Sequence, residues 1–181
     1  SDGTLEKDIN LQISLKLEKL LKLMGYNTVM TRSEDTLIYS GNPDTTRARK
    51  VSDLNNRLEI AREHPDAIFI SIHQNYFTQS KYSGAQVFYS PNNENSKLLA
   101  EKIQSSVVEL IQPENGRKIK KSGSDIFLLD RIEIPAVMVE CGFMSNPSES
   151  LLLKNEQYQK KTALSIADGI NKYLMHIREE Q

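Results

Sequence analysis

The chain has 181 residues, of which 38% are hydrophobic and 26% are charged, and its formal net charge at pH 7 is -1. A chain of this length buries about 70% of its unfolded surface, which predicts one domain with a hydrophobic core. The balanced charge gives no reason to expect a nucleic-acid partner, and no stretch reaches the roughly 20 apolar residues that a membrane-spanning helix needs.

The first elements are a helix, a short strand and a long loop. Apolar residues recur with helical spacing over residues 5–24, and Gly25 stands where a helix usually stops. The segment 26–32, YNTVMTR, has the composition of a short strand. Residues 33–50 contain turn formers and charges without a period, so they predict a long loop, and long loops in compact domains are often functional or mobile.

A second helix and two further strands follow. Ser52 or Asp53 is suited to cap the helix, which is expected to end near Pro65. Residues 67–73, AIFISIH, form a continuous apolar run, as expected of a strand that is covered on both faces. Residues 85–90, AQVFYS, predict another strand.

The last part of the chain continues this alternation. A helix of about 15 residues is predicted from Asn95 or Ser96, a buried strand over 134–143, and a final helix over 156–176. Helices that alternate with apolar strands predict an α/β fold with a mostly parallel central sheet and helices on both faces. No linker or repeat is visible, so we expect a single domain over residues 1–181.

Three side chains are candidates for chemistry. His73 and Glu140 end two of the predicted strands, and in open α/β sheets ligands bind beyond the carboxyl ends of the strands. Glu6 lies in the first turn of the first helix. Each has a structural alternative: His73 as a hydrogen-bonded residue, and Glu6 as a carboxylate favoured by the helix dipole. Glu140 is harder to explain in this way, because a carboxylate after an apolar run is costly to bury without a partner.

Other reactive residue types favour structural roles. Cys141 is the single cysteine, which excludes an internal disulfide, and it is expected to be a small core residue. His64 and His176 lie near helix ends and are expected to be structural. The basic cluster 117–121 is expected to be a solvated loop, with contact to an anionic polymer as the alternative.

In combination, several segments resemble the zinc-dependent N-acetylmuramoyl-L-alanine amidases of bacterial cell walls. The resemblance rests on EKD at the start of the first helix, on SIHQN at the end of a strand, and on VECGFMSNP later in the chain. The cysteine after the glutamate in VECGF is similar to the branch that acts on spore cortex peptidoglycan during sporulation. The match spans essentially the whole chain.

The resemblance implies roles for individual residues. Glu6 and His73 are the implied zinc ligands, and Glu140 is the implied catalytic carboxylate. Asn75 is a candidate for binding the peptide or for orienting the ligand, with a turn residue as its alternative. Arg131 is a candidate for binding a substrate carboxylate, with a surface ion pair as its alternative. The first histidine of the family's zinc site, in a glycine-rich turn, would lie before Ser1 together with the family's first strand. We therefore expect an N-terminally incomplete domain whose full-length form holds zinc.

The implied function is hydrolysis of the amide between N-acetylmuramic acid and L-alanine of peptidoglycan, in spore cortex maturation. Its expected place is outside the cytoplasm, exported or anchored at the cell or forespore envelope, with an activating protein partner or a homodimer left open. The alternative is a non-catalytic or partner-activated peptidoglycan-binding module with an incomplete zinc site. A second alternative is an α/β hydrolase that uses paired carboxylates without a metal.

Overall fold

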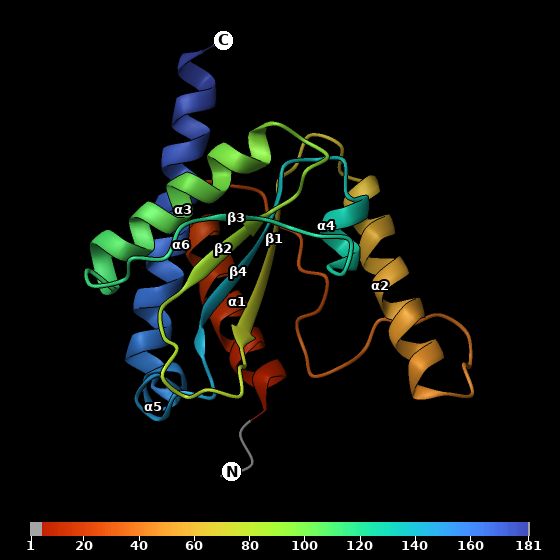
Figure 1. Ribbon diagram of the computed structural model, residues 1–181. Helices are drawn as coiled ribbons and strands as arrows, with labels where there is room; N and C mark the ends of the chain where they lie inside the picture. Colours follow the sequence, from red (N-terminus) through yellow and green to blue (C-terminus); the bar gives the residue numbers. More distant parts are fainter. Residues whose placement is uncertain (1–4, 181) are drawn as a thin grey trace.

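The computed structural model describes residues 5–180. Within them the chain forms six helices and four strands (Figure 1). In chain order these are α1 Glu6–Leu23, α2 Thr46–Arg62, β1 Phe69–Asn75, β2 Gln86–Tyr89, α3 Asn95–Ile111, β3 Lys120–Lys121, α4 Phe127–Arg131, β4 Ala136–Phe143, α5 Pro147–Lys154 and α6 Glu156–Glu179. In this part of the chain, no helix combines the length and the apolar character that a membrane span requires.

The strands form one mixed sheet in the order β1-β4-β2-β3. β1 pairs with β4 and β2 pairs with β3 in parallel, whereas β2 and β4 are antiparallel. The expected α/β fold with a mostly parallel sheet is therefore confirmed, with one antiparallel pairing that the sequence did not indicate. Because side chains alternate along a strand, the register decides which residues share a face.

One face of the sheet carries the larger core. Helices α1, α3 and α6 cover this face, and α6 lies against both of the others. The strands contribute inward-facing residues at alternate positions, as a two-residue period requires. These residues are Ile70, Ile72, Val87, Val137, Val139 and Cys141.

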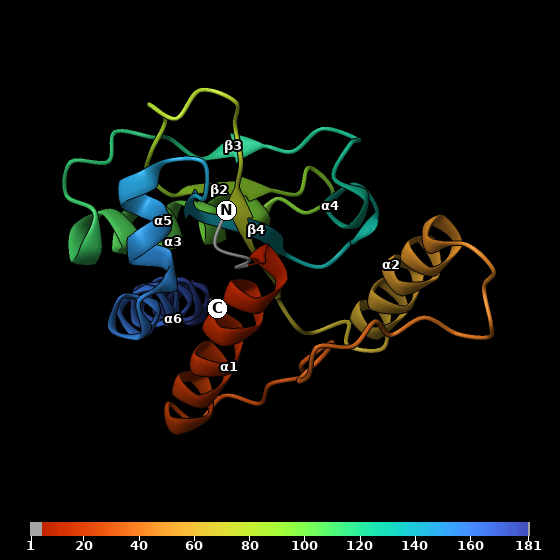
Figure 2. The same ribbon diagram turned by 90° about the horizontal axis from the view of Figure 1, so that it is seen from below.

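The opposite face is covered by α2 and α4 over the half that contains the amino ends of β1 and β4. A second apolar cluster there joins Leu58 of α2 and Leu129 of α4 to Phe69, Phe88 and Met138 of the sheet. Figure 2 shows α2 at the side of the molecule, away from α1, α3 and α6. Helices on both faces were expected, and the arrangement leaves the carboxyl ends of β1 and β4 beyond this second cluster.

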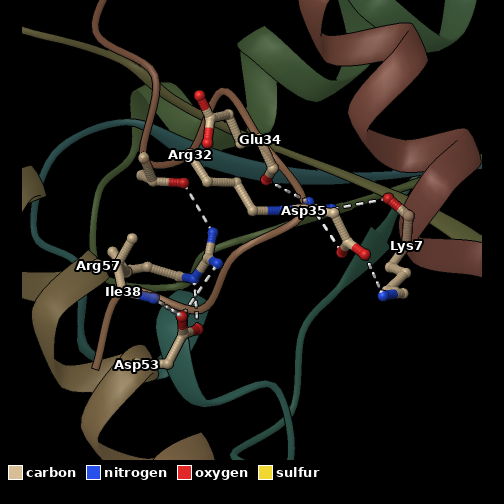
Figure 3. Close-up of polar contacts among 8 residues, drawn as sticks. Lys7, Arg32, Glu34, Asp35, Ile38, Asp53 and Arg57 are labelled. Atoms are coloured by element: carbon tan, nitrogen blue, oxygen red, sulfur yellow. Dashed lines mark hydrogen bonds and ion pairs between the residues drawn. The ribbon is translucent and has the colours of Figure 1, made fainter.

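The predicted strand over residues 26–32 is wrong. No strand forms there, because the segment runs beside helices instead of beside a strand of the sheet. Side chains hold it in place: Arg57 of α2 donates from Nη1 to Thr31 Oγ1 at 2.7 Å, and Arg32 donates from Nη2 to the carbonyl oxygen of Lys7 at 2.7 Å (Figure 3). Composition favoured a strand, but a strand also needs a neighbour, which local sequence does not specify.

The predicted start of the second helix is also wrong. The helix begins seven residues before Asp53, and Thr45 is its N-cap, with Oγ1 accepting from the backbone N–H of Ala48 at 3.1 Å. Arg, Ala and Lys have high helix propensity, but the first turns of α2 are exposed, so no apolar period marks them. The short elements β3, α4 and α5 were not predicted, because each is too short to show a period.

Candidate active site

His73 and Glu140 are directly paired in the parallel register of β1 and β4. Paired residues of neighbouring strands lie about 4.8 Å apart at the backbone and project from the same face of the sheet. This is the face opposite the larger core, because the residues before and after them in β1 and β4 point into that core. The expectation that the imidazole and the carboxylate meet at the carboxyl edge of the sheet agrees with this register.

Glu6 joins this pair from the first turn of α1. His73 Nδ1 and Glu6 Oε1 are 3.0 Å apart, and both side chains are 43% exposed. The side-chain amide of Asn10 donates to the same oxygen at 3.0 Å, and the backbone N–H of Gln74 donates to it at 3.2 Å. Helix α1 thus presents a carboxylate directly to the end of β1.

The hydrogen bonds keep Glu6 ionised. Burial alone would raise its pKa, but the bonds from His73, Asn10 and Gln74 outweigh burial and lower the pKa to about 2. An ionised carboxylate only accepts hydrogen bonds, so His73 Nδ1 carries the proton in their contact. The Glu6 carboxylate is therefore negatively charged at neutral pH.

The Glu140 carboxylate, unlike that of Glu6, lies in surroundings that favour its neutral form. Its Oε2 is inaccessible to solvent and accepts no hydrogen bond from the described residues. Burial raises its pKa to about 7, with the charge of Glu6 adding to this effect and the positive form of His73 opposing it. Two carboxylates in one site with separated pKa values are a recurring feature of acid and base catalysis.

Asn10 and Gln74 belong to the site, although the sequence did not identify them. The Gln74 side chain donates to Asn10 Oδ1 at 3.1 Å, and Asn10 in turn donates to Glu6. The two amides therefore form a hydrogen-bonded chain that holds the Glu6 carboxylate in place. Gln74 is 4% exposed and lies on the core side of β1. The signal was available in principle, because Asn10 follows Glu6 by one helical turn and Gln74 follows His73 directly.

The side chains of Glu6 and His73 are of the types that bind zinc. Imidazole nitrogen and carboxylate oxygen are typical zinc ligands, and Glu6 and His73 already present such atoms to each other. Catalytic zinc sites have three protein ligands, however, and residues 5–180 contain no cluster of three or more His, Cys, Asp or Glu side chains arranged to hold a metal. The chemistry of the pair fits zinc, and a third ligand would have to come from outside the described residues.

Asn75 ends β1 beside the site. Its carbonyl oxygen accepts from the backbone N–H of Met144 at 2.8 Å, and the register between β1 and β4 shifts between His73 and Asn75. Asn75 therefore lies two residues after His73 at the end of β1, and its role in binding the peptide stays a prediction.

Arg131 lies at the other end of the sheet, so its predicted place in the site is wrong. It lines a cavity with Pro65 and Ile134, which precede β1 and β4. Its guanidinium is 3.5 Å from Asp130 and stacks over the Phe127 ring at 4.1 Å. The surface ion pair that was the alternative for Arg131 is what the structure shows.

The segment SNPSE, residues 145–149, holds the loop that leaves the site. Asn146 caps α5 by accepting from the backbone N–H groups of Ser148 and Glu149, and its side chain donates to the carbonyl oxygen of Ser80 at 2.9 Å. Ser145 Oγ accepts from the backbone N–H of Phe77 at 3.0 Å. This part of the sequence therefore fixes the loop 76–85 beside the ends of β1 and β4.

Comparisons with known proteins find similar sequences over nearly the whole chain. The sequence profile described as N-acetylmuramoyl-L-alanine amidase matches residues 1–172. The germination-specific N-acetylmuramoyl-L-alanine amidase of Bacillus subtilis is 34% identical over 169 residues, which are 93% of this chain and 70% of that protein. The amidase LytC of Bacillus subtilis is 30% identical over 95% of this chain and 32% of its own length.

Solved structures extend the agreement to the fold. The CwlD amidase from Clostridioides difficile, whose structure is a complex with the GerS lipoprotein, is 44% identical with a TM-score of 0.91, over 96% of this chain and 88% of that chain. The amidase AmiC2 of Nostoc punctiforme is 27% identical with a TM-score of 0.81, over 96% and 87% of the two chains.

Proposed function

The chain belongs to the N-acetylmuramoyl-L-alanine amidase family, and from this premise we propose that it uses Glu6, His73 and Glu140 with zinc to cleave peptidoglycan. The bond cleaved joins the lactyl group of N-acetylmuramic acid to the L-alanine of the stem peptide. Cleavage releases the stem peptide from the glycan.

The observation that carries the proposal is the buried Glu140 carboxylate opposite His73. Its Oε2 has no partner among the described residues, and its pKa of about 7 suits a group that gains and loses a proton at neutral pH. We assign to Glu140 the removal of a proton from the attacking water and its delivery to the departing amine of alanine. The apolar strand around Glu140 supplies the desolvation that this exchange needs.

Glu6 and His73 are the proposed zinc ligands. When bound, zinc would lower the pKa of a water and polarise the scissile carbonyl. Asn10 and Gln74 orient the Glu6 carboxylate through the hydrogen bonds that already fix it. Asn75, at the end of the same strand, is the proposed contact for the peptide.

The relatives support a role in spores. The germination-specific amidase of Bacillus subtilis and CwlD of Clostridioides difficile share between a third and a half of the aligned residues with this chain, and CwlD also shares its fold. We infer that this chain acts on spore cortex peptidoglycan, at the cell or forespore envelope, where a wall substrate is accessible.

A partner-activated form of the same function has its own support. Residues 5–180 provide two of the proposed zinc ligands, and the solved structure of CwlD contains a lipoprotein partner. In this form the chain binds peptidoglycan but holds zinc weakly until another group completes or stabilises the site. The third ligand is then the residue to find, either in the full-length protein or in its partner.

The test is an amidase assay on muropeptides with the full-length protein, combined with metal analysis. We expect zinc to copurify, chelation to stop the reaction, and Glu140→Gln to lower kcat by on the order of 10²- to 10⁴-fold while zinc content stays unchanged. Glu6→Ala and His73→Ala should lower zinc content as well as activity. Glu114→Gln, an exposed carboxylate elsewhere in the chain, is the matched control.

Full turnover by Glu140→Gln would show that Glu140 does not carry out the proton transfer. Zinc-loaded protein that leaves muropeptides intact would favour the non-catalytic module. Activity that returns only with an added protein would establish the partner-activated form.

A further inference from the structure

We propose that Arg117 binds a carboxylate of the stem peptide and makes the enzyme select stem peptides whose carboxylates are free. The inference rests on the proposed function, because it assigns a specificity-determining residue to the same site. Arg117 belongs to the basic cluster 117–121, whose sequence predicts a solvated loop, with contact to an anionic polymer as the alternative.

Three contacts hold the Arg117 guanidinium in one position. Nε donates to the carbonyl oxygen of Ser83 at 2.7 Å, and Nη1 donates to Gln86 Oε1 at 3.2 Å. The guanidinium also stacks on the Phe143 ring, with Cζ 4.6 Å from the ring centroid. A solvated arginine on a surface loop would not be held from three sides.

One carboxylate fixes the backbone at two of the three groups that hold Arg117, Ser83 and Phe143. Glu149 Oε1 accepts from the backbone N–H of Gly84 at 2.8 Å, next to Ser83, and its Oε2 accepts from the backbone N–H of Phe143 at 2.7 Å. Gly84 has φ of +90°, a conformation that favours glycine. The position of Arg117 is therefore determined before any ligand binds, which lowers the entropy cost of binding one.

Gln86 connects Arg117 to the proposed catalytic residue. Gln86 of β2 is directly opposite Glu140 of β4 in the antiparallel register. Side chains of such a pair project from the same face with Cβ atoms about 5 Å apart. The Arg117 guanidinium is thus separated from Glu140 by a single side chain.

Some N–H groups of the Arg117 guanidinium have no acceptor among the described residues. In the part of the chain that the structure describes, no acidic side chain forms an ion pair with Arg117, and its guanidinium donates to protein atoms from Nε and Nη1 but not from Nη2. The side chain is partly exposed, and Lys118 and Lys120 beside it are exposed and add positive charge. A planar guanidinium with free N–H groups is suited to a carboxylate ligand.

The substrate offers such a carboxylate. The acidic residue that follows L-alanine in the stem peptide keeps a free carboxyl group beside the one that forms the amide to the next residue, and an extended residue spans about 3.5 Å. We place the peptide so that it runs from Glu140 toward β2, which brings its second residue to the neighbourhood of Gln86 and Arg117.

The test measures binding to full-length Glu140→Gln protein, which keeps substrate intact. The probes are N-acetylmuramoyl-L-alanyl-D-glutamate with free carboxylates and the same molecule with both carboxylates amidated. We expect the free form to bind on the order of 10- to 100-fold more tightly, and Arg117→Met to remove this preference while binding of the diamide stays unchanged. Arg117→Lys should keep only part of it. Arg62→Met, an exposed arginine of α2, should keep all of it.

The outcomes separate three cases. If the parent protein binds both probes equally, or if Arg117→Met weakens both probes to the same extent, Arg117 only supports the loops and the inference fails. If neither probe binds and the active protein also leaves muropeptides intact, the proposed function fails with it. Unfolding curves and zinc content of each variant confirm that the fold and the metal ligands are unaffected.

Discussion

Cys141 follows Glu140 directly, yet the two side chains occupy opposite faces of β4. The Cys141 thiol is 1% exposed and points into the larger core, where burial and the neighbouring Glu140 carboxylate raise its pKa to about 12. The thiolate is the reactive form of cysteine, so this residue is inert in the folded protein. The cysteine in the VECGF segment is a core residue, and the chemistry of the segment belongs to the glutamate.

We expect Cys141 to be unreactive until the protein unfolds. Native protein treated with a thiol reagent such as dithionitrobenzoate at pH 8 should react at least about 100-fold more slowly than protein in denaturant, because the thiol is both inaccessible and protonated. The denatured sample controls for reagent quality. Rapid labelling of native protein would mean that β4 opens or that its register differs.

At the scale of elements, Asp53 ties α2 to the segment that precedes it. Its Oδ1 accepts from the backbone N–H of Ile38 at 2.8 Å, and its Oδ2 accepts from Arg57 Nε at 2.7 Å (Figure 3). Burial opposes ionisation, but the bonds from Arg57 and Ile38 outweigh it and hold the pKa of Asp53 below its usual value. The charged form of Asp53 therefore stabilises the folded state.

The pH dependence of stability follows from the lowered pKa of Asp53. Because the folded pKa lies below the unfolded value of about 3.9, the stabilisation is complete above that value and is lost as pH falls through the folded pKa. We expect Asp53→Asn to lower the free energy of unfolding by roughly 1.5–3 kcal/mol at pH 7 and by less at pH 3. Urea unfolding at both pH values measures this, with the exposed Asp66→Asn as control. An equal loss at both values would contradict the role of the charge.

Gly169 of α6 lies where α6 approaches the backbone of α3 closely. A Cβ at this position would lie 2.5 Å from Ile103 Cα and 2.9 Å from the carbonyl oxygen of Lys102, both backbone atoms of α3. Backbone atoms of a packed helix cannot move aside without separating α3 from α6. The two helices can therefore pack this closely only because Gly169 has no side chain.

Gly169→Ala is therefore expected to destabilise the protein, although alanine favours a helix more than glycine does. We expect a net loss of about 1–3 kcal/mol, because the steric cost exceeds the helix-propensity gain of about 1 kcal/mol. Thermal unfolding measures it, and Lys161→Ala at an exposed position of α6 is the control. A stabilised Gly169→Ala would show that α3 and α6 are farther apart.

For the whole molecule, the sequence predicted those elements whose structure is determined by residues close together in the chain. Helices α1, α3 and α6 and the buried strands β1 and β4 have a period or an apolar run of their own, and they lie where it indicated. Glu140 was recognised because a carboxylate in such a run needs an explanation. Residues 26–32 had strand composition but no neighbouring strand, so their prediction was wrong.

The same reason explains what was missed around the site. Arg131 was predicted near the site from its place in the chain, but α4 lies at the amino ends of β1 and β4. Gln74, Glu149 and Arg117 act through partners far away in sequence, such as Asn10, Gly84 and Ser83. Long-range pairs of this kind are visible only in three dimensions.

The strand order also has a consequence for synthesis of the chain. β4 lies between β1 and β2, although it is the last strand in the sequence, and α1 packs against α6, the last helix. On the ribosome, β1 and β2 have no shared partner until residues 136–143 emerge, and the contacts of α1 with α6 form only after residues 156–179 emerge. The nascent polypeptide therefore exposes apolar segments until β4 and α6 emerge, and it acquires these parts of its tertiary structure late, from contacts of long sequence separation.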